Sequence, residues 1–378
     1  MQAVDGTKIA ANAAGDRTYD ATELQSLLKR TEAAIAELEA QNEGGDDSPP
    51  ARLPEALQRA KKLHQRVKDA MNHLAQQGKM KRVNLTDGDA QLMKGRNGII
   101  TGYNAQAMVS PLNPETAKRS GLLITAVEVV NSAADSGQLA PMLEKSEELT
   151  GQRVPITLAD GGYHTVASLE VGARRNQTLV MTERYHSELQ GPYFKDNFIL
   201  DSETDSYICP QGHRLPFRGF RHSKRGASGQ YRVFRASRTD CRTCPAFSVC
   251  TKDKHTGRAL RISSAEELLL KHRQWMDTDA ARSLYSRRQE MSEPTFGILK
   301  EQMNARRFLL RGMVNVRAEF NLLATAFNLR TLWRVWAKLG RLSYGARIEI
   351  PNKLAANAQI RRFFVINFGT PPVFSFTY

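Results

Sequence analysis

The alternation of extended and helical stretches is the feature that most limits how this chain can fold. Strand-forming residues predict extended segments at residues 3–12, 102–110, 122–130, 154–159 and 178–182. Two helices separate the first two segments, and single helices separate the last three. Elements in this order are typical of one sheet covered by helices. The sequence therefore predicts a mixed α/β domain.

The two helices after the first strand form a unit of their own. Apolar residues recur at helical spacing at residues 22–42 and again at 54–77. A Gly-Gly-Asp-Asp-Ser-Pro-Pro run at residues 44–50 separates them, and glycine and proline end helices. We therefore expect a helical hairpin, inserted between the first and second strands.

Residues 214–261 carry much of the positive charge. They hold 13 Lys or Arg residues and two acids, in a chain with a net charge of +15 and a pI near 9.8. Such an excess favours a polyanionic partner, of which nucleic acid is the most common. Four aromatic residues lie among the arginines: Phe217, Phe220, Tyr231 and Phe234. Arginines interleaved with aromatics suit contact with phosphates and stacking on bases.

The composition is that of a globular protein, with 41% hydrophobic and 25% charged residues. The sequence has no run of about 18 apolar residues and no charged-then-apolar N-terminal signal. We therefore expect a cytoplasmic protein that associates with the nucleoid.

All four cysteines fall within one short, basic part of the chain. Cys241 and Cys244 form a C-x-x-C pair, with Cys209 before it and Cys250 after it. Four thiols match the ligand number of a closed tetrahedral Zn²⁺ site, and His213 is a substitute ligand. The alternative is four unrelated cysteines in a core. We expect a structural Zn²⁺ that staples this small module.

Three acidic residues stand where a metal site could form. Asp5 lies at or near the edge of the first predicted strand and Asp160 at the end of another, each before a glycine, and Glu293 lies on a predicted late helix. Strand ends at the edge of an open sheet are common ligand sites. Three carboxylates can bind two Mg²⁺ ions about 4 Å apart for phosphodiester chemistry. Taken singly, each acid has a simpler explanation as a turn or surface residue, since Asp-Gly is a common turn dipeptide.

The helix that carries Glu293 offers a second charged group. Glu293 and Lys300 are seven residues apart, so they share one helix face with Phe296 or Gly297. A carboxylate can bind a metal and a lysine can bind a phosphate, so this face suits chemistry on a nucleic-acid backbone.

Six motifs together resemble a known family. They are Asp5-Gly-Thr-Lys8 with Ala11-Asn12, Gly102-Tyr-Asn-Ala-Gln106, residues 131–139 (Asn-Ser-Ala-Ala-Asp-Ser-Gly-Gln-Leu), Ala159-Asp-Gly-Gly-Tyr163, Glu293-Pro-Thr-Phe-Gly-Ile-Leu-Lys300 and Arg307-Phe-Leu-Leu-Arg-Gly312. In order and spacing, residues 3–336 resemble the catalytic domain of bacterial insertion-sequence transposases of the DDE class. That domain has a ribonuclease H-like fold, a mixed sheet flanked by helices.

The resemblance implies a function and a set of site residues. Asp5, Asp160 and Glu293 would bind Mg²⁺ or Mn²⁺ and catalyse DNA strand cleavage and strand transfer at insertion-sequence ends. Tyr285, Arg288 and Lys300 would contact the DNA near the cleavage site, in a homo-oligomer assembled on transposon ends and target. The interval from Arg288 to Glu293 is one residue longer than in the family, so either Arg288 or Gln289 takes the arginine position.

Three other acids are alternatives for a site role. Asp87 and Asp89 also follow an extended stretch and flank a glycine. Asp5 is favoured because the residues after it match the family motif. For Asp135 we expect a helix N-cap, with a role in the catalytic pocket as the secondary interpretation.

The predicted domains follow from these assignments. The ribonuclease H-like core comprises residues 1–13, 96–184 and 276–336. The helical insertion is at 14–95, the basic cysteine-bearing insertion at 185–275 and a C-terminal tail at 337–378. Family members usually have a further helical region before the first motif, so we expect an N-terminally truncated transposase. The alternative is a catalytically inactive remnant that acts only as a zinc-stapled DNA-binding protein.

Overall fold

The computed structural model describes residues 1–43, 55–76, 78, 81–95, 98–113, 121–183, 191–222, 230–251, 253 and 255–343. The chain divides into two compact units, Met1–Leu329 and Arg330–Tyr378. Helix α10 (Met313–Ser343) runs from the first unit into the second. The predicted linker at 44–50 and most of the predicted tail, residues 344–378, lie outside the described residues.

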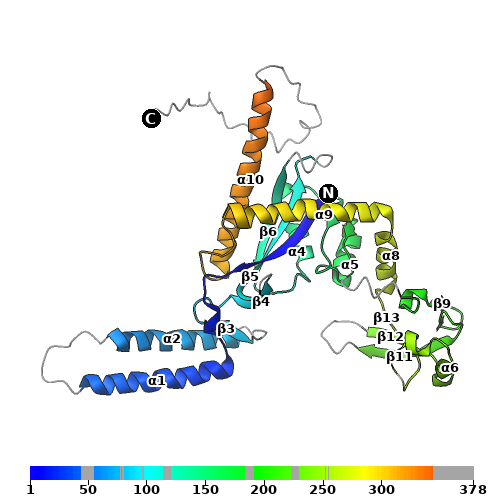
Figure 1. The fold of residues 1–378 in the computed structure, drawn as a ribbon, viewed down its shortest axis with the longest axis horizontal. Helices are drawn as coiled ribbons and strands as arrows, with labels where there is room; N and C mark the ends of the chain where they lie inside the picture. The colour runs from blue at the N-terminus through cyan, green and yellow to red at the C-terminus, as the bar shows by residue number, and fades with distance from the viewer. Residues whose placement is uncertain are drawn as a thin grey trace. The chain divides into compact units, whose positions relative to one another are not determined.

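A six-stranded mixed sheet forms the centre of the first unit (Figure 1). Its strands are β1 (Gln2–Ala10), β4 (Gln91–Gly95), β5 (Gly98–Pro111), β6 (Leu122–Val130), β7 (Ile156–Leu158) and β8 (Thr178–Val180). The order is β4-β5-β1-β7-β8, and β6 also pairs with β5. Strand β1 runs antiparallel to β5 and parallel to β7, which itself is parallel to β8. The predicted mixed α/β class is confirmed; β4 is a strand that the sequence did not predict.

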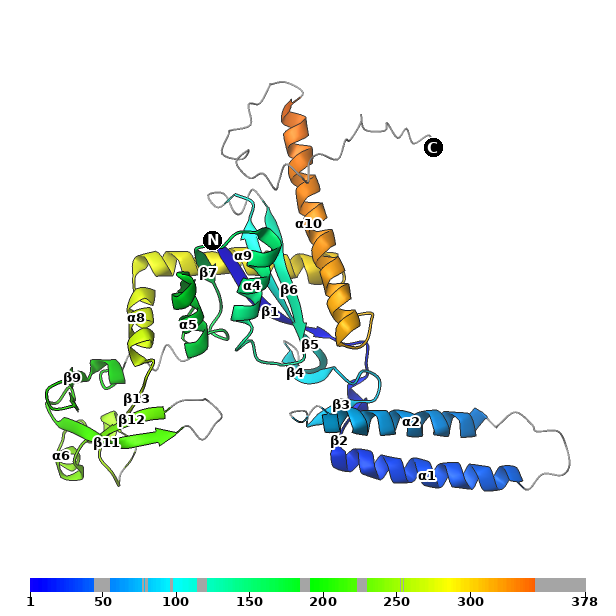
Figure 2. The same cartoon turned by 180° about the vertical axis from the view of Figure 1, so that it is seen from behind.

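Helices cover both faces of this sheet. On one face are α4 (Leu139–Thr150) and α5 (Val166–Arg175), whose side chains pack on Val4 and Met108. On the other face are α9 (Asp279–Gly297) and the first part of α10. Helix α9 lies in front of the sheet in Figure 1, and α4 and α5 lie in front in Figure 2. Helix α8 (Glu266–Met276) precedes α9.

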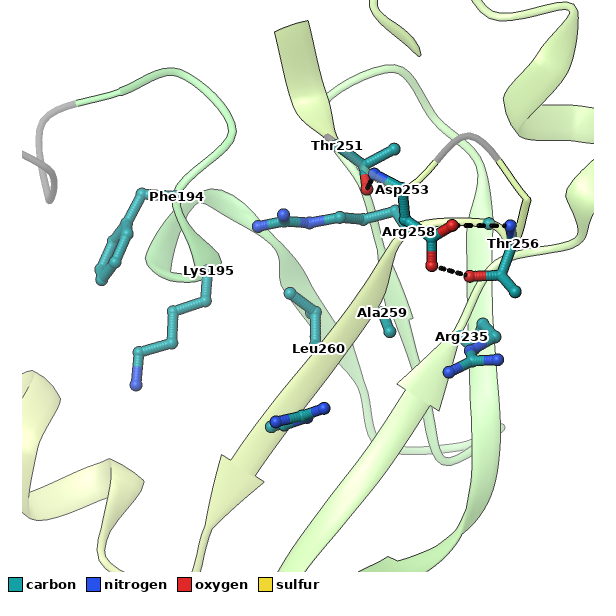
Figure 3. A pocket seen from close by; sticks show the side chains of 11 residues that line it. Phe194, Lys195, Arg235, Thr251, Asp253, Thr256, Arg258, Ala259 and Leu260 are labelled. Carbon is teal, nitrogen blue, oxygen red and sulfur yellow. Dashed lines mark hydrogen bonds between the residues drawn. The ribbon is translucent and has the colours of Figure 1, made fainter. Parts of the chain in front are cut away.

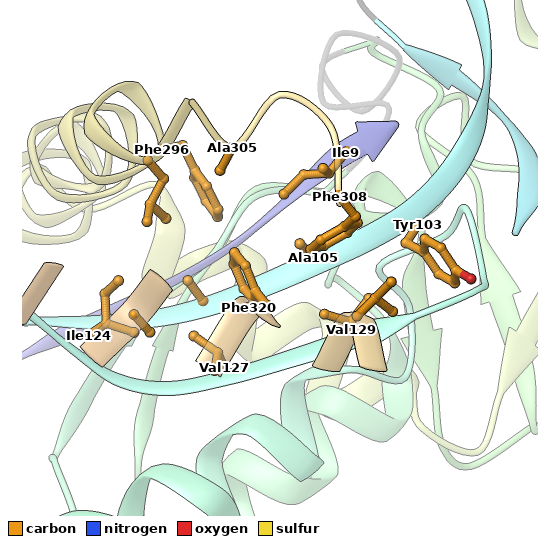
Figure 4. Packing of buried hydrophobic residues seen from close by; sticks show 14 of the residues in the cluster. Ile9, Tyr103, Ala105, Ile124, Val127, Val129, Phe296, Ala305, Phe308 and Phe320 are labelled. Atoms are coloured by element: carbon orange, nitrogen blue, oxygen red, sulfur yellow. The ribbon is translucent and has the colours of Figure 1, made fainter. Parts of the chain in front are cut away.

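The largest buried cluster fixes α9 and α10 against the strands. The Phe308 ring lies between Tyr103 and Phe320, with its centroid 5.8 Å from that of Tyr103 and 6.3 Å from that of Phe320. Figure 4 shows Phe308 beside the strand residues Ile9 and Ala105. Burial of such side chains stabilises the fold by roughly 1.5–3 kcal/mol each. Phe296 of α9 and Phe320 of α10 belong to this cluster, so the core holds both helices against the strands.

The predicted helical hairpin is present as α1 (Ala21–Glu43) and α2 (Glu55–Gln76). A short ribbon of β2 (Thr18–Asp20) and β3 (Arg82–Asn84) joins its base, and a 3-10 turn, η1 (Gly15–Arg17), precedes it. The hairpin has a small core of its own: Leu24, Val67, Ala70 and Val83.

The part of the chain that holds the cysteines is built on a second, antiparallel sheet, with the cysteines themselves in the short helices and loops beside it. Residues 191–263, which we call the cysteine module, contain η4 (Lys195–Asn197), β9 (Ile199–Asp201), β10 (Ser206–Ile208), β11 (Arg214–His222), β12 (Gln230–Arg235), α6 (Arg238–Arg242), α7 (Phe247–Cys250) and β13 (Ala259–Ser263). The strand order is β13-β12-β11-β10-β9. Two of the aromatic residues expected to stack on bases belong to the core of the module instead. Phe234 is fully buried, and Phe217 packs against it. Phe220 is 55% exposed.

In the part of the chain that the structure describes, no helix combines the length and the apolar character needed to cross a bilayer.

Candidate active site

Asp5 and Asp160 lie at the same level beside each other, Asp5 within β1 and not at a strand end as expected, and Asp160 two residues past the end of the parallel strand β7. Ala3 of β1 pairs with Leu158 of β7, and each acid follows two residues later. Strand β7 ends at Leu158, so beyond that point the β7 side of β1 is open to the loop that carries Asp160. The negative charge of Asp160 acts on Asp5 and raises its pKa. The first two predicted site acids are therefore neighbours.

The carboxylate of Asp5 is in an unfavourable place for a negative charge. Its pKa is raised to about 6, chiefly by burial; the charges of Asp160 and Asp135 contribute to the rise, whereas Arg288 and the N–H of Gly6 oppose it. Arg288 Nη1 donates to Oδ2 at 3.1 Å, and the backbone N–H of Gly6 donates to Oδ1 at 2.8 Å. Burial and like charge outweigh these donors, so the site has an excess of negative charge that a bound cation would offset.

Asp135 is the third acid at this place, and its expected role as a helix N-cap is wrong. Helix α4 begins four residues later, with Gln138 at its N-cap. Instead, Asp135 Oδ1 accepts hydrogen bonds from Asn104 Nδ2 (2.7 Å), Gln106 Nε2 (2.9 Å) and Lys8 Nζ (3.3 Å).

A signal for Asp135 was present in the sequence. Asn104 and Gln106 alternate along β5, so they share one face of it, and both are fully buried. Buried amides need hydrogen-bond partners, and an acid from a loop is a suitable acceptor.

Two glycines allow the acids to approach. A Cβ at Gly6 would lie 2.6 Å from Asp135 Oδ1 and 2.3 Å from Gln106 Nε2. A Cβ at Gly162 would lie 2.8 Å from Asp160 Oδ1 and 3.2 Å from Asp135 Oδ2. The backbone N–H of Gly162 also donates to Asp160 Oδ1 at 2.7 Å. The Asp-Gly steps therefore leave room for carboxylates, in addition to shaping turns.

Helix α9 places Arg288 and Tyr285 beside the acids. Arg288 contacts Asp5, and its guanidinium lies 5.7 Å from the centre of the Tyr285 ring. Tyr285 is fixed by its hydroxyl, 3.2 Å from Thr182 Oγ1 just after β8. Gln289 is exposed. Of the two candidates for the arginine position, Arg288 is the one that faces the site.

Lys300 reaches the same strand as Asp5. It lies in the π-helical turn η5 (Ile298–Gln302), and its Nζ donates to Thr7 Oγ1 at 2.5 Å and to the carbonyl of Lys8 at 3.3 Å. Burial lowers its pKa. The first and fifth motifs, Asp-Gly-Thr-Lys and Glu-Pro-Thr-Phe-Gly-Ile-Leu-Lys, are thus in direct contact.

Glu293 is not brought into this group. Its side chain is exposed, and among the described residues it has no hydrogen-bond or ion-pair partner. Helix α9 buries Ser292, Thr295 and Phe296, and Glu293 lies about 100° around the helix from Ser292. In the described ranges no three His, Cys, Asp or Glu side chains form a cluster that could bind a metal ion.

The two alternative acids have other partners. Asp87 accepts hydrogen bonds from the Tyr103 hydroxyl (2.7 Å) and the N–H of Gly312 (3.2 Å). Asp89 accepts from the N–H of Met313 at 2.7 Å. Both therefore hold the N-terminus of α10, where a carboxylate is favoured by the helix dipole.

The four cysteines converge in the cysteine module. All are free thiols, and together with His213 they line one small pocket. The N–H of His213 donates to Cys209 Sγ at 3.3 Å, and that of Arg258 to Cys241 Sγ at 3.4 Å. Burial raises the pKa of Cys250, and the three other thiols add to the effect. The thiols are close enough to affect one another's pKa, but in this arrangement they do not form a group that could bind a metal ion.

Comparison with protein families gives one match in this chain. Residues 208–333 match the family model of the transposase DDE domain. This match supports a DDE-type transposase. It covers about a third of the chain, including most of the cysteine module and Glu293 but not Asp5 or Asp160. A search of curated proteins and a search of solved structures found no match.

Proposed function

We propose that this protein is a DDE transposase that cleaves DNA strands and transfers them at insertion-sequence ends. The observation that carries the proposal is the position of Asp5 and Asp160 at one level of β1 and β7, with an excess of negative charge between them. The match of residues 208–333 to the transposase DDE domain supports it independently, because that match contains neither acid.

The sheet supports the ribonuclease H-like part of the proposal. A central β1 has an antiparallel neighbour in β5 and a parallel neighbour in β7, and β8 continues the parallel side. Ligand sites in open sheets lie where strands end, and Asp160 stands just past the end of β7. The proposed core at residues 1–13, 96–184 and 276–336 contains every strand of this sheet except β4.

The donor chemistry at Asp5 and Asp160 fits a divalent cation such as Mg²⁺ or Mn²⁺. Carboxylate oxygens are the ligands such ions prefer, and the pKa of Asp5 is raised by burial and by the neighbouring charges of Asp160 and Asp135, which a bound cation would offset. When bound, the ions would activate a hydroxyl and stabilise the leaving oxygen of a phosphodiester. Glu293, the proposed third ligand, would have to turn from its exposed position toward the acids. Asp135 is a further carboxylate near the pair.

The chain's own cations would orient the DNA. Arg288 lies on Asp5 and would be released when a metal takes over that carboxylate. Lys300 is anchored on β1 through Thr7, and Tyr285 positions the arginine. Released arginine and partly buried lysine are suited to bind the phosphates on either side of the scissile bond. Assembly as a homo-oligomer on DNA and association with the nucleoid belong to the same proposal.

We also propose that the four cysteines bind a structural Zn²⁺. Backbone N–H groups already donate to Cys209 and Cys241, which is how thiolates are stabilised. Four soft sulfur ligands in one pocket suit zinc better than magnesium. The module's own core is small, so a metal would supply stability that packing cannot.

Nicking of supercoiled plasmid tests the enzymatic proposal. Purified protein with Mg²⁺ is expected to convert supercoiled plasmid to open circles, and Asp160→Asn is expected to abolish the conversion. Asp240→Asn changes charge equally on exposed α6 and should nick as the wild type does. Activity that survives Asp160→Asn would overturn the proposal.

One observation favours a second candidate function. The exposed position of Glu293 fits a remnant that binds DNA through a zinc-stapled module without cutting it. A wild-type protein that fails to nick yet binds DNA in a salt-sensitive manner would establish that alternative.

A further inference from the structure

The cysteine module contains a cavity of about 400 Å³ that is separate from the acids of the candidate active site. It follows β13, the edge strand of the module's sheet, and reaches from Phe194 and Lys195 on one side to Thr256 on the other (Figure 3). Four basic side chains line it: Lys195, Arg235, Arg258 and Arg261.

Two of these cations have no partner in the described part of the chain. Arg235 and Arg261 are exposed, and the side chain of neither forms a hydrogen bond or an ion pair there. Strand pairing puts them together, because Arg235 is opposite Ala259 and Arg261 is opposite Val233. Residues directly opposite or two apart lie on the same face, so the two guanidinium groups share one face of β12 and β13.

The other two cations are fixed by the protein. Arg258 donates to the carbonyls of Cys250 and Tyr193, both at 3.0 Å, and no carboxylate neutralises it among the described residues. Its Nε is buried without a hydrogen-bond partner in those residues. Lys195 forms an ion pair with Glu266. The cavity therefore has one rigid arginine and two available ones.

One acid lines the cavity, and its oxygens are already used. Asp253 accepts hydrogen bonds from the N–H groups of His255 (2.9 Å) and Thr256 (3.1 Å) and from Thr256 Oγ1 (2.5 Å). These donors, that of the Thr256 side chain above all, lower its pKa to about 2. The lining keeps a net positive charge, which complements an anion.

We propose that this cavity binds a phosphodiester of the DNA backbone, held by Arg235, Arg258 and Arg261. Planar guanidinium groups suit phosphate oxygens, and three from adjacent positions can hold one bridging phosphate and its neighbour. The Phe194 ring at the edge of the cavity offers a surface for the attached nucleotide. The proposal rests on DNA being the substrate, and it adds a second contact outside the cleavage centre.

Binding of a fluorescein-labelled duplex oligonucleotide, followed by anisotropy over a salt series, tests the site. Arg235→Ala/Arg261→Ala is expected to weaken binding about tenfold and to reduce the salt slope by about 2, one for each lost phosphate contact. Arg238→Ala/Arg242→Ala removes the same charge from exposed positions on α6, outside the cavity, and is expected to change affinity less than about twofold. Equal weakening in both double variants, or none in either, would overturn the inference.

Two further measurements distinguish DNA-backbone binding in this cavity from binding of a free nucleotide and from the proposed enzymatic activity. Deoxyadenosine monophosphate is expected to displace DNA only at concentrations far above that of the oligonucleotide. Displacement at equal nucleotide concentration would mean that the cavity binds a free nucleotide, which would contradict the inference. Plasmid nicking distinguishes the failures. If wild-type protein does not nick plasmid but the Arg235→Ala/Arg261→Ala variant still loses DNA binding, the result supports the cavity as a DNA-binding site and contradicts the enzymatic proposal.

Discussion

Arg288 Nη1 lies 3.1 Å from Asp5 Oδ2, although 283 residues separate the two in the chain. The contact joins a helix near the end of the first unit to its first strand, at the place where the carboxylate is destabilised by burial and by Asp160. The guanidinium of Arg288 offsets part of the negative charge of the acids.

The first prediction concerns the pKa of Asp5. Replacing Arg288 by Gln removes the favourable charge, so the pKa should rise further above about 6. Asp160→Asn removes a repulsive charge, so in that variant the pKa should fall toward its usual range. Carboxyl carbon NMR over a pH series in the absence of metal measures both. Shifts in the same direction for the two variants would show that the three side chains are not arranged as described.

A second prediction concerns close backbone approach at the end of β1. A Cβ at Gly102 would lie 2.2 Å from the carbonyl oxygen of Ile9, and backbone cannot move aside as a side chain can. Gly102→Ala should therefore destabilise the protein by about 1–3 kcal/mol or more, as overpacking does. Chemical denaturation measures the change.

Gly297 is the matched control for that substitution. It ends α9, and a Cβ there would meet nothing within 4 Å. Gly297→Ala should leave stability unchanged or increase it by up to about 1 kcal/mol, because alanine favours helix. Equal losses in the two variants would contradict the prediction.

The pattern of strands and helices could be predicted because it depends on local periodicity. The segments at 102–110 and 122–130 are within β5 and β6, and both helices of the hairpin end within one residue of their predicted bounds. Strand β4 could not be predicted because its Gln-Leu-Met-Lys-Gly sequence has little strand character. What holds it is pairing along Gly98–Gly102 of β5, which is tertiary.

The site was predictable only where motif and topology agree. The motifs grouped Asp5 with Asp160, and the parallel pairing of β1 with β7 is what brings them to one level, although Asp5 lies within its strand and not at its end. Asp135 was assigned a capping role, since its partners Asn104 and Gln106 come from a distant strand. The position of Glu293 depends on the rotation of α9, which Met291, Thr295 and Phe296 fix through the core. Periodicity cannot give that rotation.

A third prediction concerns zinc in the cysteine module. Purified protein is expected to carry zinc in a ratio of about one per chain, and its four thiols should react with a disulfide reagent only after a chelator is added. Cys244→Ser should lose the metal, whereas His213→Gln should keep it, because four thiols suffice. Metal analysis and thiol titration decide the matter. Zinc-free protein with four freely titrating thiols would exclude the site.

The last prediction concerns acid sensitivity at His272. This side chain is 9% exposed, and its ring centre lies 5.1 Å from that of His164. Burial and the neighbouring His164 lower the pKa of His272 from 6.5 to about 4, while the carbonyl of Leu179 opposes the shift. Glu183 and Arg273 also face the pair and act on His164 in opposite directions.

The sign follows from proton binding. Between about pH 6.5 and 4 the unfolded chain binds a proton that the folded chain does not, so stability falls as the pH falls through this window. The loss from His272 should approach roughly 3 kcal/mol at the acid end. His272→Gln should remove most of it, whereas the exposed His222→Gln should keep it. Asp5, whose pKa is raised to about 6, affects stability in the same pH window with the opposite sign. The free energy of unfolding is therefore measured by denaturant unfolding at pH 7 and at pH 5 for each variant and for the wild type. The change between the two pH values is then compared between each variant and the wild type. An unchanged pH dependence in His272→Gln would contradict the buried, neutral state of this histidine.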